Sequence, residues 1–218
     1  MICRSVRNDF SVKSMKRIVN WQFHHNMHLL SVVLYTLSLK STELELLTYP
    51  YSQLCIATLG ISLKNTKYFP YTIKICKMLN NLNSVCPDLY IPVSQYILHL
   101  FTGTDDYLNR KTKPASDALP NFEAAIKFSK DFYEKTETKD FVFKSSIQEL
   151  KSHLEIIKTS LSFPELVIPL CQTLSQFKRR CRNPPYYNII RELYDKVRNV
   201  TEKITKYRKT VDLTDAEA

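Results

Sequence analysis

The scarcity of glycine is the feature that most constrains what this chain can fold into. Only Gly60 and Gly103 occur in 218 residues. Tight hairpin turns and phosphate-binding loops both depend on glycine, because it adopts left-handed backbone conformations without strain. The sequence therefore disfavours a many-stranded β protein and a glycine-rich nucleotide site, and it favours an all-α chain with polar connections.

Length and hydrophobicity bound the organisation of the chain. Hydrophobic residues make up 44% of the sequence, too many for wholesale disorder, and the length suffices for one domain or two small ones. We expect a polar arm over residues 1–12, a single helical domain over 13–208 with a loop at 102–119, and a disordered acidic tail over 211–218. No secretory signal is recognisable at the start, and no uninterrupted apolar run is long enough to predict a membrane span.

Apolar residues recur at helical spacing through the first half of the domain. We expect helices over about 13–39, over 41–63 with Ser41 as N-cap and a kink at Pro50, from Pro70 to the asparagines at 80–83, and over 89–101. The expected buried stripe of the first helix comprises Ile18, Trp21, Leu29, Val32, Val33 and Leu37. That of the second comprises Leu46, Leu47, Leu54, Ile56, Leu59 and Leu63, and that of the third Ile73, Cys76, Leu79 and Leu82.

The second half is more regular. The spacing predicts helices over about 121–135, over 144–161, from Phe163 with a bend at Pro169, and after Pro184–Pro185 to about residue 208. The last of these carries an apolar stripe made of Ile190, Leu193, Val197, Val200, Ile204 and Tyr207. This stripe fits one face of a helical core, and a short coiled-coil seam is the alternative.

About seven or eight helices thus follow one another through short connections, each with one apolar face. Consecutive antiparallel helix pairs that stack in this way form an α-solenoid. Because no internal repeat of fixed period is present, an irregular helical bundle remains the alternative architecture.

Residue types that carry catalysis or bind metals are present but not in a productive pattern. His24 and His28 are four residues apart and could share a helix face, yet no glutamate follows His24 and no third ligand stands out. Asp105 and Asp106 fall in a polar loop, and no nucleophile motif is present. The six cysteines form no C-x-x-C pair, which indicates reduced thiols in a reducing compartment. We therefore predict no enzyme activity, no metal and no cofactor.

Positive charge gathers near the end of the domain. The chain has a formal net charge of +10, and between residues 178 and 209 eleven basic residues face only three acidic ones. The basic residues are Lys178, Arg179, Arg180, Arg182, Arg191, Lys196, Arg198, Lys203, Lys206, Arg208 and Lys209. Tyrosines at 186, 187, 194 and 207 interleave with them. Phosphates attract such a surface and aromatic rings can stack on unpaired bases, so RNA or an acidic protein segment is the expected partner. A solvated outer helix face is the alternative.

Five segments in order resemble the C-terminal part of the nucleolar complex protein 2 family. They cover residues 19–34, 47–82, 89–98, 121–132 and 162–170. The residues that carry the resemblance are Asn20, Trp21, Gln22 and Phe23; Tyr49 and Pro50; Phe69 and Pro70; Lys127, Ser129 and Lys130; and Phe163, Pro164, Glu165 and Leu166. Lys64 and Lys67 stand near the Phe-Pro step where the family carries arginines.

The resemblance implies a HEAT- or armadillo-like helical scaffold without catalytic activity. It implies binding to nucleolar complex proteins 1 and 3 and association with pre-60S precursors of the large ribosomal subunit, and through them with pre-rRNA. It further implies location in the nucleus, in nucleolus and nucleoplasm, and no membrane or small-molecule substrate. Members of the family are longer, so three explanations stay open for this sequence: a fragment, a truncated gene model or a reduced homologue.

Overall fold

The computed structural model describes residues 12–86, 89–102, 107–109 and 121–210, and within them the chain forms helices and turns without strands. The all-α prediction is therefore confirmed. The described elements are α2 (Val12–Ile18), α3 (Trp21–Leu37), η1 (Ser38–Lys40), α4 (Thr42–Ser62), η2 (Thr66–Tyr68), α5 (Phe69–Val85), α6 (Val93–Thr102), η3 (Tyr107–Asn109), α7 (Lys130–Tyr133), α8 (Thr136–Ile157), α9 (Phe163–Leu166), α10 (Ile168–Arg180) and α11 (Pro184–Thr210). In the described part of the chain, no helix is both long and apolar enough to span a bilayer.

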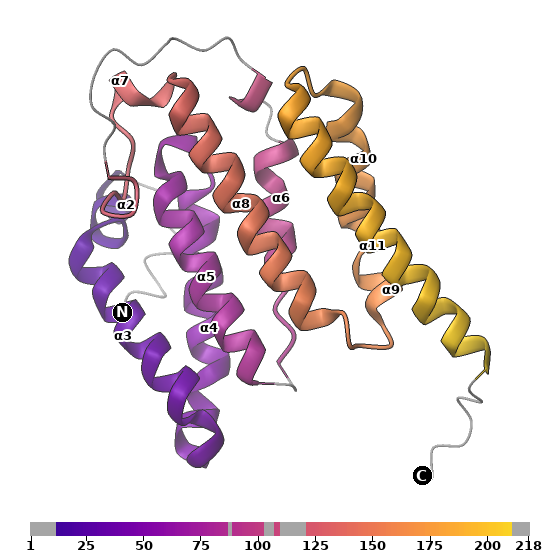
Figure 1. Ribbon diagram of the computed structural model, residues 1–218. Helices are drawn as coiled ribbons and strands as arrows, with labels where there is room; N and C mark the ends of the chain where they lie inside the picture. The colour runs from indigo at the N-terminus through magenta and orange to yellow at the C-terminus, as the bar shows by residue number, and fades with distance from the viewer. Residues whose placement is uncertain (1–11, 87–88, 103–106, 110–120, 211–218) are drawn as a thin grey trace.

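The helices are arranged largely in chain order (Figure 1). At one end α3, α4 and α5 pack together, in the middle α6 and α8 pack on α5 and on each other, and at the other end α10 and α11 follow. Helix α10 reaches the middle layer through α6, and α9 lies against α11. This progression is what an α-solenoid requires, although the helices differ widely in length. The choice between a solenoid and an irregular bundle stays a prediction.

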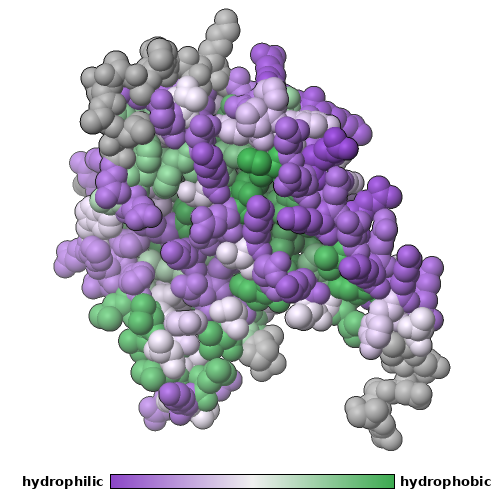
Figure 2. Space-filling view, in the orientation of Figure 1, coloured by the Kyte–Doolittle hydropathy of each residue, from purple (hydrophilic) through white to green (hydrophobic). Residues whose placement is uncertain are grey.

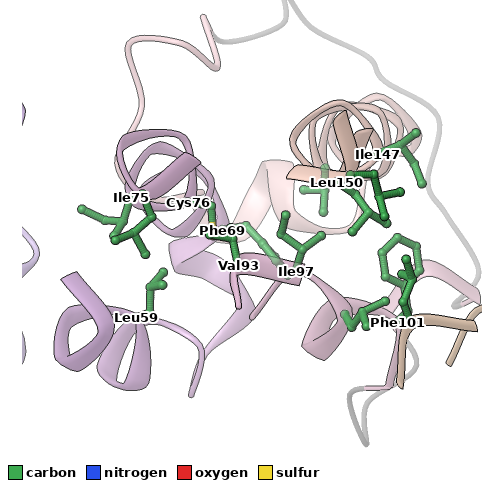
Figure 3. Close-up of a cluster of buried hydrophobic side chains, with 14 of the residues drawn as sticks. Leu59, Phe69, Ile75, Cys76, Val93, Ile97, Phe101, Ile147 and Leu150 are labelled. Carbon is green, nitrogen blue, oxygen red and sulfur yellow. The ribbon is translucent and has the colours of Figure 1, made fainter. Parts of the chain in front are cut away.

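One contiguous apolar core runs through these layers. Figure 3 shows its centre, where side chains from four helices meet. They are Leu59 of α4, Phe69, Ile75 and Cys76 of α5, Val93, Ile97 and Phe101 of α6, and Ile147 and Leu150 of α8. Each of these residues is at most 4% exposed, so α5, α6 and α8 are held together chiefly by apolar burial.

Prolines begin several helices, as the sequence predicts. Pro70 and Pro164 lie in the first turns of α5 and α9, and Pro184 is the first residue of α11. A first-turn proline is tolerated because its missing N–H would have no partner inside the helix. The prediction for Pro169 is wrong. The chain breaks at Val167, and Pro169 then lies in the first turn of α10 rather than bending one long helix.

The single helix expected over 13–39 is divided by Asn20. Its side chain accepts a hydrogen bond from the backbone N–H of Phe23 at 2.8 Å and so caps α3. The same amide group donates to the carbonyl oxygens of Arg17, at 2.7 Å, and Lys16, at 3.2 Å, at the end of α2. One asparagine therefore ends one helix and begins the next, which apolar spacing alone does not reveal.

The stripe expected to be buried on the first helix is largely wrong. Ile18 is buried, but Trp21, Leu29, Val32 and Leu37 are 39–66% exposed. Helix α3 instead buries the face that carries His24, Met27, Ser31 and Leu34. Because α3 carries apolar residues on most of its circumference, the helices that pack on it, and not its own pattern, select the buried side.

The prediction for α4 is partly wrong, although Leu54, Ile56 and Leu63 are half-buried against the core. Leu46 and Leu47, assigned to its buried face, are 73% and 46% exposed, whereas Leu59 is buried as predicted. The buried side includes Ser52 and Thr58, whose hydroxyls donate to the carbonyl oxygens of Tyr49, at 2.7 Å, and Leu54, at 2.8 Å. Small hydroxyl side chains paired in this way can be buried at low cost, and they allow close helix packing. Ser41 occupies the N-cap position without a side-chain cap bond, and α4 continues through Pro50.

The helix expected over 121–135 does not form as such. Residues 121–129 make turns, and only Lys130–Tyr133 is helical. The side chain of Asn121 accepts from the backbone N–H groups of Glu123 and Ala124, and the N–H of Phe128 donates to the carbonyl of Lys67 at 2.8 Å. The following helix starts at Thr136, eight residues earlier than the expected start at Lys144, and it ends at Ile157.

The cysteines of the described residues are free thiols. Cys55 and Cys76 are buried in the core between α4 and α5, and burial raises the pKa of both, that of Cys55 to about 12. Cys3, the polar arm up to residue 11, most of the 102–119 loop and the acidic tail lie outside the described residues.

Candidate nucleic-acid interface

Helix α11 presents the basic residues to solvent because its opposite side is apolar. Tyr186, Ile190, Leu193 and Val197 are buried, and Val200 and Ile204 are half-buried against the core. These positions recur every three or four residues, so they lie along one face. Tyr207, the last member of the expected stripe, is 57% exposed, so the buried face ends before it. Figure 2 shows the strongly hydrophilic surface over this part of the molecule.

Two exposed lysines on α11 are the strongest candidate phosphate contacts. Lys196 and Lys203 are seven residues apart, which places them two turns apart on one side of the helix. Neither forms an ion pair with any residue that the structure describes. Lys206 and Lys209 are exposed further along the helix, three and six residues after Lys203.

Two arginines of the same helix are already engaged. Arg191 lies 3.9 Å from Asp195, and Arg198 donates to Glu202 at 2.9 Å, each pair spanning one turn. Both side chains remain more than 60% exposed, so they can still reach a phosphate at the expense of weak intrahelical pairs.

The basic residues at the end of α10 have partly structural roles. Lys178, Arg179 and Arg180 form the last turn, where positive charge is favoured by the helix dipole. The ammonium of Lys178 lies 4.6 Å from the ring centroid of Tyr194, and Arg180 donates to the carbonyl of Phe101 at 3.5 Å. Arg182 is exposed just beyond the helix, with its backbone N–H bound to the side-chain oxygen of Asn109.

Arg208, near the end of α11, connects this helix to α9 and to the residues just before it. Its guanidinium donates to both carboxylate oxygens of Glu165, each at 2.6 Å, and to the carbonyl of Leu161. Arg208 thereby holds the pKa of the Glu165 carboxyl at about 2. Both residues were singled out by sequence for different reasons, and the structure joins them in one contact between α9 and α11.

The tyrosines do not form a common stacking platform. Tyr186 is buried, its ring stacks on Phe143 with centroids 4.0 Å apart, and its hydroxyl donates to Asp140. Tyr194 is half-buried under Lys178. Tyr187 and Tyr207 are exposed and remain available for stacking.

The remaining motif residues divide between packing and exposure. Phe69 and Pro70 are buried, with Phe69 stacked over Tyr107, and Phe163 is also buried, as α9 begins there. Pro164 and Leu166 are half-buried, and Phe23 packs at the edge of the core. Exposed motif residues are Trp21, Gln22, Tyr49, Pro50, Lys127 and Ser129, while the Lys130 side chain lies outside the described set.

A pocket that sequence reasoning missed lies between α3 and α5. Its volume is about 210 Å³, and it is lined by His24, His28, Ser31, Val32, Tyr35, Lys74, Lys77, Met78 and Asn81. His24 is 7% exposed, and neither ring nitrogen has a hydrogen-bond partner among the described protein atoms. Burial, with Lys74 and the neighbouring histidines, lowers the pKa of His24 to about 4. Within the described residues no three potential ligands come together for a metal ion.

Comparison with known proteins gives one family and two curated relatives. The Noc2p family model matches residues 1–218. The sequence is 24% identical over 209 residues to nucleolar complex protein 2 of Drosophila melanogaster, covering 94% of this chain and 27% of the relative. It is 23% identical over 204 residues to an uncharacterized NOC2 family protein of Schizosaccharomyces pombe, covering 91% of this chain and 28% of the relative. The chain thus spans about a quarter of the length of the curated relatives that it matches.

Proposed function

This chain belongs to the Noc2p family, and we propose that it serves as a non-enzymatic helical scaffold of ribosome biogenesis in the nucleolus. The match of the family over residues 1–218 is the observation that carries the proposal. The relative from Drosophila melanogaster is named as a protein of a nucleolar complex, which supports the location and a role in an assembly.

The proposed partners are nucleolar complex proteins 1 and 3 and the pre-60S particle, which the chain accompanies from nucleolus to nucleoplasm. Helices with exposed apolar residues support this role. Large apolar side chains gather where α3, η1 and α4 meet, and Leu39 and Leu46 there are 74% and 73% exposed. Figure 2 shows the corresponding apolar area at the lower left, over the end of α3 and the start of α4. Apolar clusters of this kind are typical of protein interaction surfaces.

The basic face of α11 contributes, in this proposal, a contact with pre-rRNA that does not depend on base sequence. Lys196 and Lys203 are exposed and form no ion pair with the described residues, which leaves both ammonium groups available to phosphates. The exposed arginines at 179, 182, 191 and 198 extend the same charge. Arg208 is the member of the basic set that the proposal treats as structural, because it is bound to Glu165.

The experiment has two parts. Epitope-tagged chain is recovered from a nuclear extract, and its proteins and RNA are identified by mass spectrometry and by probes for large-subunit precursors. Recovery of nucleolar complex proteins with those precursors is the expected result. Recovery of RNA without these proteins would favour the alternative function, a general basic RNA-binding helical module.

Direct RNA contact is tested with the purified chain and a single-stranded pre-rRNA fragment. The double variant Lys196→Glu/Lys203→Glu should bind more weakly and lose roughly 0.7 per contact from the slope of log affinity against log salt. The matched control is Lys144→Glu/Lys151→Glu, because these two exposed lysines are also seven residues apart, on α8. If both double variants lose RNA affinity equally, the effect depends on net charge alone, and the proposal of a specific basic face on α11 is contradicted.

A further inference from the structure

Helix α3 carries a stripe of exposed side chains. Trp21, His25, His28, Val32 and Tyr35 are all exposed. They are spaced alternately by four and three residues, so they lie along one side of the helix. This spacing is typical of residues that pack against another helix. The stripe lies beside the face of α3 that packs on the core.

Helix α5 supplies a second wall of different chemistry. Lys74, Lys77 and Asn81 are spaced by three and four residues, and with Met78 they line the pocket against α3. Lys77 and Asn81 are exposed, and Lys77 forms no ion pair with the described residues. The ammonium of Lys74 lies 5.9 Å from the Trp21 ring centroid, which joins the two walls at one end.

The residues that line this α3–α5 groove include two lysines and two histidines but no acidic side chain. One wall therefore offers apolar and aromatic surface. The other offers positive charge, chiefly from the exposed Lys77, because the ammonium of Lys74 also donates to the carbonyl oxygen of Glu123. A groove between two helices admits a third helix in the ordinary geometry of helix packing. A partner that fits has an apolar edge toward Val32 and Tyr35 and carboxylates toward Lys74 and Lys77.

The inner wall points to the same partner. His24 is more than nine-tenths buried and lines the pocket, and neither of its ring nitrogens has a hydrogen-bond partner among the residues that the structure describes. A neutral imidazole retains one N–H donor, and leaving it unpaired in a buried place costs free energy. A carboxylate that enters between the lysines brings an acceptor to this wall.

We propose that the α3–α5 groove docks an amphipathic helix of a partner protein, with the helix's acidic edge on Lys74 and Lys77 and its apolar edge on Val32 and Tyr35. The inference rests on the proposed scaffold function and assigns a surface and a partner chemistry to it. A protein helix fits better than RNA, because Val32 and Met78 offer no hydrogen bonds and the groove holds only two lysines.

The test begins with the full chain carrying the photo-crosslinker p-benzoylphenylalanine in place of Val32. After irradiation in nuclear extract, the cross-linked peptide is identified by mass spectrometry and then synthesised with a fluorescent label. Its affinity is measured by anisotropy for the wild type, Lys77→Glu, Lys77→Arg, Val32→Glu and the control Lys144→Glu. All of these positions are exposed, and thermal melts confirm that each variant is folded.

The expected cross-linked peptide is an acidic amphipathic helix. Lys77→Glu and Val32→Glu should each weaken its binding about tenfold or more, whereas Lys77→Arg and Lys144→Glu should retain it. A crosslink to RNA, to a second copy of the chain or to a basic segment would overturn the proposal, as would unchanged affinity in Lys77→Glu. If the unmodified chain recovers large-subunit precursors while the groove fails these tests, the docking site alone is wrong.

Discussion

Arg208 and Glu165 form a two-pronged ion pair, with both carboxylate oxygens 2.6 Å from guanidinium nitrogens, across 43 positions of sequence. The pair ties the last turns of α11 to α9, beyond the point where the apolar face of α11 ends. This contact attaches α11 beyond Ile204, the last of its residues that packs against the core.

Arg208→Gln should release the end of α11 without unfolding the domain. We expect faster amide hydrogen exchange in the last two turns of α11 and an unchanged midpoint of global unfolding, because exposed ion pairs contribute little to overall stability. Since the pKa of Glu165 is lowered to about 2 from 4.5, the stabilisation that this contact gives should be complete above pH 4.5 and be lost as the pH falls toward 2. The control, Arg198→Gln, breaks only a pair within α11 and should leave exchange at the end of the helix unchanged.

The stack of Tyr186 on Phe143 should dominate the attachment of α11 to α8. Tyr186→Ala should lower the free energy of unfolding by about 3–5 kcal/mol, because it leaves a cavity beside Phe143. Tyr186→Phe keeps the stacked ring and loses only the hydrogen bond to Asp140, so a loss of about 1.5 kcal/mol is expected. Urea denaturation checks both values, and the exposed Tyr187→Phe serves as control. Equal losses for the two Tyr186 variants would mean that the hydroxyl, not the ring, carries the attachment.

His153 should make stability depend on pH. It is fully buried in α8, neither ring nitrogen has a partner among the described atoms, and burial lowers its pKa from 6.5 to about 4. The unfolded chain therefore binds the proton more readily, so stability is complete above pH 6.5 and falls as the pH drops toward 4. His153→Leu should flatten this fall, measured as the free energy of unfolding at pH 7 and pH 5, whereas replacing the exposed His99 with Gln should not. The similarly buried His24 should account for part of the slope that remains.

Asn20 should be needed for the break between α2 and α3. Asn20→Ala removes the cap on Phe23 and the two bonds to α2, and we expect a loss of about 1 kcal/mol or somewhat more. Asn20→Asp keeps the cap acceptor but not the amide donor, so its stability should lie between those of the wild type and Asn20→Ala. Thermal unfolding followed by circular dichroism measures the order of the three proteins. Equal stability of Ala and Asp variants would assign the whole effect to the bonds with α2.

Sequence patterns predicted the fold best where one face of a helix is apolar and the other is polar. Apolar spacing over 144–161 predicts a buried stripe of Ile147, Leu150, Leu154, Ile157 and Leu161. The first four are buried, whereas Leu161 follows the end of α8 and is 46% exposed. Ile190, Leu193 and Val197 are buried as predicted. The same reasoning was less successful for α3 and α4. Apolar residues occupy several sides of these helices, and α4 also buries serine and threonine hydroxyls that are hydrogen-bonded to its own backbone. Their buried faces depend on neighbouring helices that periodicity does not describe.

The candidate surface shows a similar limit. The sequence located the basic residues of α10 and α11, and charge alone could not separate Arg208, bound to Glu165, from Lys196 and Lys203, which have no described ion pair. The groove between α3 and α5 was beyond prediction, since it joins residues some fifty positions apart. The sequence analysis singled out His24 only as a member of a histidine pair with His28. Only the packing of α3 on α5 brings His24 and the two lysines of the groove together.

The two thiols buried between α4 and α5 can report how often these helices separate, because they react only when the helices open. Cys55 and Cys76 are at most 1% exposed, and burial keeps both protonated at neutral pH, so a disulfide reagent can reach neither while the helices stay closed. The partly exposed Cys86, Cys171 and Cys181 should react first, which separates a fast phase from a slow one. The rate of the slow phase then measures how often α4 separates from α5. A ligand that spans α3 and α5 should make this phase slower.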